Sequence, residues 1–103
     1  MNTMKTRDFI DNQKIADFCR RNKVRSFSLF GSYSMGKPRP GSDVDILISF
    51  QPEACPTLLD LAEMREELET LFGKSVDLVE EEAIRNPYRR ASILRGKKIL
   101  YAA

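Results

Sequence analysis

GSYSMGKPRPGSDVDILISF, residues 31–50, decides the fold, because a loop runs directly into a buried strand within it. Residues 31–42 contain three Gly, two Pro and three Ser, which is the composition of a loop. Residues 43–50 are mostly apolar and β-branched after Asp43, and this near-continuous run predicts a strand buried on both faces. Upstream, residues 25–30 alternate in polarity, which predicts a short strand that stops at Gly31.

Helices are predicted on both sides of these two strands. Residues 8–22 carry apolar side chains at a spacing that fits one helical face, namely Phe9, Ile15, Phe18 and Cys19. Residues 57–72 predict a second helix, in which Thr57 and Asp60 form a capping pair and Gly73 follows the last turn. We expect its apolar stripe to belong to the core: Leu58, Leu61, Ala62, Leu68, Leu71 and Phe72.

The remaining elements complete a mixed sheet. Residues 76–79 (VDLV) and 97–101 predict two more strands, and Asn86 followed by Pro87 predicts a helix that ends near Gly96. The order of elements predicts an α/β (α+β) fold with a mixed sheet of about four strands and helices packed on it. We expect one domain spanning 1–103, since soluble domains usually contain roughly 100–150 residues.

The composition excludes several classes of enzyme. The chain contains no histidine, so it cannot form a Ser-His-Asp triad, a Cys-His pair or an HExxH zinc site. Its chemistry must therefore use carboxylates, hydroxyls, amines, the backbone and metal ions. A formal charge of +2 is too small to predict nucleic-acid binding by itself.

The sequence predicts a cytoplasmic protein. Its N-terminus has no apolar region typical of a signal peptide, and no apolar stretch is long enough to cross a bilayer. Cys19 and Cys55 are far apart and form no CxxC pair, so we expect both to be reduced and buried rather than zinc ligands.

Three aspartates predict a metal site. Asp43 and Asp45 are two residues apart on the predicted strand, so their side chains point to the same face. Two carboxylates there repel each other and are costly to desolvate, and divalent cations offset that cost. Asp77 interrupts the apolar run of residues 76–79, and it would lie roughly 5 Å from the pair if the two strands were neighbours. The hard oxygen ligands favour Mg²⁺ or Mn²⁺.

Gly31 and Ser32 predict a phosphate site just upstream of the carboxylates. Glycine allows the backbone to approach a phosphate closely, and the Ser hydroxyl with nearby N–H groups can hold phosphate oxygens. Residues 31–37 also fit GxxxxGK, but Pro38 follows, so a helix that cradles phosphates cannot easily begin there. Taken alone, Gly31-Ser32 would be a plain turn and a DxD pair a solvated strand end. The spacing of all three parts favours the functional interpretation.

The stretch resembles the signature of nucleotidyltransferases of the DNA polymerase β superfamily. In that signature an apolar-Gly-Ser turn precedes, at a set distance, an Asp-apolar-Asp-apolar motif. Phe30-Gly31-Ser32 fits the first part, residues 43–46 (DVDI) fit the second, and Asp77 fits the separate third carboxylate. The length and element order are also similar to minimal nucleotidyltransferases, so the resemblance covers nearly the whole chain. The one departure is Met35, which stands where many members have Arg.

The resemblance implies roles for the site residues. Asp43, Asp45 and Asp77 would be catalytic metal ligands for two Mg²⁺ ions, with Mn²⁺ as an alternative. Asp77 would complete the site of the ion that activates the acceptor hydroxyl. Gly31 and Ser32 would hold the β- and γ-phosphates of ATP or another NTP, and pyrophosphate would leave.

The resemblance also implies a partner. Minimal nucleotidyltransferases commonly act as antitoxins beside a helical HEPN-type toxin and add AMP to a tyrosine of it. Two alternatives remain open, a non-catalytic antitoxin that only binds its partner and an independent small-molecule nucleotidyltransferase. We expect neither a membrane nor a nucleic acid as partner.

The basic C-terminal segment has two interpretations. The solvated surface of a helix is favoured over a surface that docks an acidic partner or the triphosphate. Its members are Arg85, Arg89, Arg90, Arg95, Lys97 and Lys98. Tyr33 could stack on a base or simply cover the loop, and the sequence does not decide between them.

Overall fold

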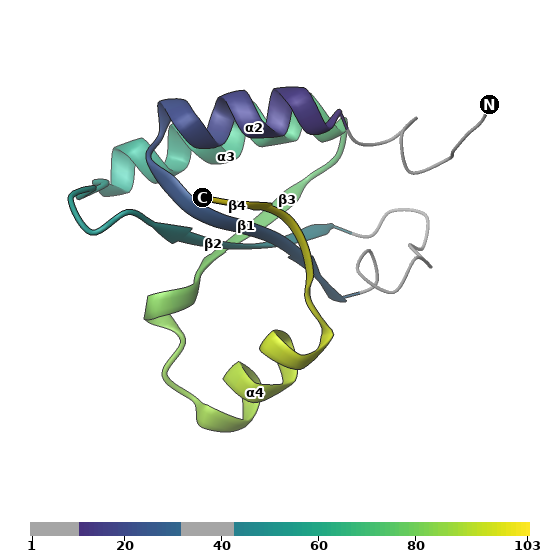
Figure 1. Ribbon diagram of the computed structural model, residues 1–103. Helices are drawn as coiled ribbons and strands as arrows, with labels where there is room; N and C mark the ends of the chain where they lie inside the picture. Colours follow the sequence, from purple (N-terminus) through teal and green to yellow (C-terminus); the bar gives the residue numbers. More distant parts are fainter. Residues whose placement is uncertain (1–10, 32–42) are drawn as a thin grey trace.

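A computed structural model describes residues 11–31 and 43–103. The four strands in this part form one sheet in the order β3-β2-β1-β4 (Figure 1). Strand β2 lies antiparallel to β1 and parallel to β3, and β1 is also antiparallel to β4. The mixed sheet predicted from the sequence is therefore confirmed. The strands are β1 (Val24–Phe30), β2 (Val44–Phe50), β3 (Val76–Glu80) and β4 (Lys98–Ala102).

Capping residues set the ends of the helices. The Asp11 carboxylate accepts hydrogen bonds from two backbone N–H groups at the start of α2, Thr57 and Asp60 form the predicted capping box, and Asn86 caps α4. A short 3₁₀ helix, η2, follows β3 directly. Residues 8–10 of the first predicted helix lie outside the described part. The helices are α2 (Asn12–Arg21), α3 (Leu58–Phe72), η2 (Glu81–Ala83) and α4 (Pro87–Gly96).

The sheet separates two apolar clusters of different size. Helices α2 and α3 cover one face, and α4 lies on the other side (Figure 1). Under α2 and α3, Ile46 and Ile48 of β2 pack in the larger cluster with Phe18 and Leu68. On the opposite face, Leu47 packs in a smaller cluster with Phe30, Ile84 and Ile93. Strand β2 is thus buried on both faces, as its apolar run predicts.

The stripe predicted for α3 is only partly correct. Its buried residues are Met64, Leu68 and Phe72, and Leu61 and Leu71 pack beside them. Leu58, which was predicted to be in the core, is 85% exposed because it lies in the first turn at the rim of the packed surface. None of the helices in residues 11–31 and 43–103 is long and apolar enough to cross a bilayer.

The two cysteines differ in their environment. Cys19 is fully buried under the sheet, and this burial raises the pKa of its thiol from 9.0 to about 12, although nearby Arg20 opposes the shift. Cys55 is exposed, so the expectation that both cysteines are buried is wrong for Cys55. It follows Pro52 and precedes Pro56 in an irregular segment outside the core.

We predict that iodoacetamide at pH 8 modifies Cys55 and spares Cys19. A pKa higher by three units lowers the thiolate fraction roughly 10³-fold, and burial also blocks access. Because the folded state disfavours the Cys19 thiolate, stability should fall as the pH rises from 9.0 toward 12. Mass spectrometry of native and urea-unfolded protein checks the labelling. Equal labelling of both cysteines in native protein would contradict it.

Candidate active site

Two of the predicted aspartates lie side by side on neighbouring strands. Asp45 is the second residue of β2, Asp77 is the second residue of β3, and the parallel register pairs them directly. Neighbouring strands are separated by roughly 4.8 Å, so the two carboxylates leave the backbone close together. The sequence could predict this distance only by assuming that the two strands were neighbours, and the structure confirms that they are.

The two aspartates point to the side of the sheet that faces α4. Asp45 and Leu47 are two residues apart, as are Asp77 and Val79, and alternate residues of a strand share a face. Leu47 and Val79 both belong to the small cluster that packs against α4. The aspartates therefore extend the row of apolar side chains under α4. Asp43 directly precedes β2 and is exposed.

Among the described residues, the negative charges that act on Asp45 outweigh the positive one. The pKa of Asp45 is raised, first by partial burial and then by the negative charges of Asp77 and Asp43. The positive charge of Arg89 opposes the shift. A site that raises the pKa of a carboxyl in this way favours the binding of a cation.

Gly31 directly follows β1, the strand on the other side of Asp45. Its φ of +71° lies in the left-handed region, where glycine is favoured. A Cβ built on Gly31 would lie 3.3 Å from Cγ of Asp45 and would overlap its Oδ2. The close approach of this backbone to the carboxylate therefore requires glycine. Ser32, the second predicted phosphate ligand, lies outside the described residues, as do Tyr33 and Met35.

The three aspartates supply ligands that suit a hard divalent cation. Asp45 and Asp77 are paired on neighbouring strands and Asp43 is two residues from Asp45, and their oxygens are the donors that Mg²⁺ and Mn²⁺ prefer. Within the described part of the chain, however, no three Asp, Glu, Cys or His side chains are arranged closely enough to enclose an ion. The residue types and the shared face fit a metal site, and the side chains must turn toward one another to share an ion.

Arg89 is the site residue that the sequence did not single out. It lies in the first turn of α4, and no ion pair to it is found in the described residues. The adjacent Arg90 instead donates to the Glu81 backbone oxygen at 2.9 Å and lies 3.6 Å from the Glu81 carboxylate. In a segment with six basic residues, only the packing of α4 distinguishes the Arg near the aspartates.

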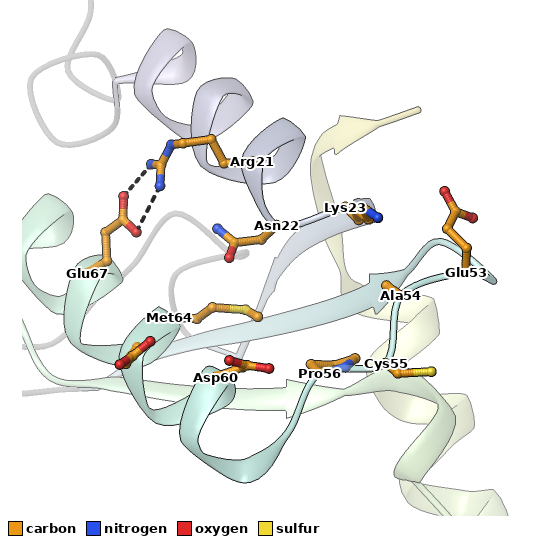
Figure 2. Close-up of a pocket in the computed structure, with 11 residues that line it drawn as sticks. Arg21, Asn22, Lys23, Glu53, Ala54, Cys55, Pro56, Asp60, Met64 and Glu67 are labelled. Atoms are coloured by element: carbon orange, nitrogen blue, oxygen red, sulfur yellow. Dashed lines mark hydrogen bonds and ion pairs between the residues drawn. The ribbon is translucent and has the colours of Figure 1, made fainter.

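A polar hollow at the other end of β2 is separate from this site. It has a volume of about 460 Å³, and its wall includes Glu53, Cys55 and an ion pair between Arg21 of α2 and Glu67 of α3 (Figure 2). This hollow lies beyond Phe50, which is seven positions from Asp43 along the strand, roughly 20 Å. The hollow therefore has no part in the chemistry of the aspartates.

Comparison with known proteins identifies the family. Residues 12–100 match the sequence model of the nucleotidyltransferase domain family. The chain belongs to the nucleotidyltransferase family. This assignment and the three hard carboxylate donors together favour a divalent metal ion as the cofactor of this nucleotidyltransferase.

The chain is also similar to individual members of known function and structure. The protein adenylyltransferase MntA of Thermococcus cleftensis is 44% identical over 63 residues, which is 61% of this nucleotidyltransferase and 62% of the relative. A chain in a crystal structure of a toxin-antitoxin with AMP-PNP is 25% identical, with a TM-score of 0.74 over 91% of this chain and 75% of that one. A chain in the complex of tri-AMPylated Shewanella oneidensis HEPN toxin with MNT antitoxin is 23% identical, with a TM-score of 0.65. The match covers 89% of this chain and 70% of the antitoxin complex chain. At this identity, the similarity shows only that the two chains share a fold.

Proposed function

We propose that this nucleotidyltransferase transfers AMP from ATP to a tyrosine hydroxyl of a HEPN-type toxin and so acts as its antitoxin. The observation that carries the proposal is the direct pairing of Asp45 with Asp77, with Asp43 beside them, in a chain of this family. The similarity to a protein adenylyltransferase and to a toxin-antitoxin chain supports the nature of the acceptor.

The reaction joins the acceptor oxygen to the α-phosphorus of ATP. The bond between the α-phosphorus and the oxygen that bridges to the β-phosphate breaks, pyrophosphate leaves, and the hydroxyl proton passes to solvent. Asp43 and Asp45 would hold two Mg²⁺ ions, and Asp77 would complete the ligands of one of them. When bound, the ions supply charge stabilisation and lower the pKa of the acceptor hydroxyl. Gly31 and Ser32 would bind the β- and γ-phosphates.

Arg89 extends this proposal. Its exposed guanidinium near Asp45 is suited to hold a phosphate oxygen or the departing pyrophosphate, because arginine binds phosphates through several N–H groups. The interpretation of the basic segment as a solvated helix surface thus remains for most of its residues, and Arg89 is assigned to the substrate.

One observation favours a second candidate. Because no three acidic side chains among the described residues enclose a metal site, a non-catalytic antitoxin that blocks its partner by binding is also consistent with the structure. The two candidates differ in one property, since only the enzyme needs Asp43.

We predict that Asp43→Asn lowers AMP transfer by about 10³-fold. A metal ion contributes several kcal/mol to a phosphoryl-transfer transition state, and each 1.36 kcal/mol corresponds to a tenfold change in rate. The measurement uses α-labelled ATP, Mg²⁺ and the product of the gene adjacent to this one. Asp43 is exposed and precedes β2, so the substitution should leave the core unchanged.

The matched control is Glu53→Gln, which removes one exposed carboxylate far from the aspartates and should keep full activity. Label on the partner that is lost only in Asp43→Asn supports the proposal. Label on a small molecule without the partner identifies a small-molecule enzyme. A tight complex without label in either variant identifies the non-catalytic antitoxin.

A further inference from the structure

A groove runs beside the aspartates on the β3 side of the sheet. Its volume is about 550 Å³, and it is lined by residues of α3, β3, η2 and α4. Both Leu78 and Val79 contribute to its wall. Leu78 packs against the large cluster and Val79 against the small one, so their side chains lie on opposite faces of the sheet. The groove must therefore pass over the edge of the sheet.

Strand β3 forms that edge. It is the first strand in the order β3-β2-β1-β4, and only β2 pairs with it in the described part of the chain. The outer side of an edge strand presents backbone N–H and C=O groups that an extended segment of another protein can pair with. A groove that crosses such an edge suits an extended polypeptide better than a compact small molecule.

The groove lies next to the candidate active site. Leu78 and Val79 follow Asp77 directly in β3, so the wall of the groove begins within roughly 7 Å of that aspartate along the strand. At the α4 end the wall includes Arg89, whose charge acts on Asp45. A segment in the groove would therefore reach the aspartates from the β3 side.

The sheet order assigns the two substrates to opposite sides of β2. Gly31 at the end of β1 approaches Asp45 from one side, while Asp77 and the groove lie on the other. If the triphosphate is held beside Gly31, the groove is left to the second substrate. That substrate is the one that presents the acceptor hydroxyl.

The surface of the groove indicates the chemistry of this segment. Leu58, which is 85% exposed, contributes apolar surface to the wall, as do Leu61 and Ala62. The wall contains two positively charged residues, Arg65 and Arg89, and one negatively charged residue, Glu80. Arg65 also forms an ion pair with Glu69 at 3.4 Å. An apolar segment with acidic residues beside it complements this wall, because its side chains would cover Leu58 and face the two arginines.

We propose that the groove between α3 and β3 binds an extended, apolar and acidic segment of the partner that carries the acceptor hydroxyl. This inference rests on the proposed function, since it names the surface that receives the acceptor. The segment lies over the edge of β3, contacts Leu58, and places the hydroxyl next to Asp77.

Two adjacent leucines provide a matched test. Leu58 lines the groove, whereas Leu59 is 68% exposed and does not line it. Both lie in the first turn of α3, where an added glutamate is favourable to the helix dipole, so Leu58→Glu and Leu59→Glu should both fold. We expect Leu58→Glu to raise the Kd for the product of the adjacent gene by about tenfold or more, and Leu59→Glu to leave it unchanged.

Four measurements separate the outcomes. Calorimetry gives the affinity for the partner, a fluorescent ATP analogue gives the affinity for nucleotide, and α-labelled ATP gives the transfer. Weaker partner binding by Leu58→Glu alone, with unchanged nucleotide binding, supports the groove as the acceptor surface. Equal partner binding by the two variants overturns it, and so does a loss of nucleotide binding in Leu58→Glu alone. A wild-type dimer in sedimentation that only Leu58→Glu dissociates would assign the groove to a second copy.

Failure of the proposed function gives a different result from failure of the groove proposal. If the wild-type protein binds the partner but transfers no label to it, the enzyme proposal fails. The groove is then judged by binding alone. A selective loss in Leu58→Glu still assigns the groove to the partner, and equal binding by both variants removes that assignment.

Discussion

Asp45→Asn is expected to lower AMP transfer by about 10³-fold and, at the same time, to raise the melting temperature of the metal-free protein. The loss of transfer follows from the proposed role of Asp45 as a metal ligand, because a metal ion contributes several kcal/mol to a phosphoryl-transfer transition state. The gain in stability follows from the raised pKa of Asp45, because burial and two neighbouring carboxylates disfavour its charged form in the folded state. Asparagine has nearly the same shape and carries no charge.

The same shift predicts a pH dependence. The folded protein holds the Asp45 proton more tightly than the unfolded chain does, since the pKa is raised above 3.8. The contribution of Asp45 to stability is therefore present below pH 3.8 and is lost as the pH rises through the raised pKa. In Asp45→Asn this decrease should be absent, which thermal unfolding at several pH values will show.

Metal binding provides a readout that does not depend on activity. Mg²⁺ should raise the melting temperature of the wild type, since a ligand that binds only the folded state stabilises it, and should have little effect on Asp45→Asn. The control is Glu63→Gln on α3, which removes a carboxylate from an exposed position and should respond as the wild type does. An active Asp45→Asn variant would contradict the assignment of Asp45 as a metal ligand.

The part of the fold that the sequence predicted well depends on local signals. The apolar run of β2, the Thr57–Asp60 capping box and the Asn86-Pro87 helix start each arise from neighbouring residues, and the structure confirms all three. The spacing from Gly31 to Asp43 and Asp45 is likewise a property of one continuous stretch. Such signals do not depend on how the elements pack.

What the sequence missed depends on tertiary packing. Leu58 continues the apolar stripe of α3, and only the placement of the first helical turn leaves it exposed. Arg89 and Arg90 are indistinguishable as a pair of basic residues, and it is the docking of η2 against α4 that draws Arg90 to Glu81. The pairing of Asp45 with Asp77 also requires strand order, which no local pattern determines.

Gly31→Ala is expected to lower AMP transfer by roughly 10²-fold, because a misplacement of about 1 Å at a reacting centre can have that effect. The new methyl group would overlap Oδ2 of Asp45, so either the carboxylate or the end of β1 must move. The φ of +71° at Gly31 also disfavours any residue with a Cβ, and we expect a loss of about 1–3 kcal/mol in the free energy of unfolding.

Gly73→Ala separates the two effects of the Gly31 substitution. Gly73 has a φ of +70°, nearly equal to that of Gly31, but a Cβ built there meets no atom within 4 Å. Both variants should therefore lose stability in urea unfolding, while only Gly31→Ala should lose AMP transfer from α-labelled ATP. If the two variants lose transfer equally, backbone strain alone explains the effect. Only the Gly31 substitution displaces the Asp45 carboxylate. Equal losses of transfer would therefore mean that the close approach of Gly31 to Asp45 has no catalytic role.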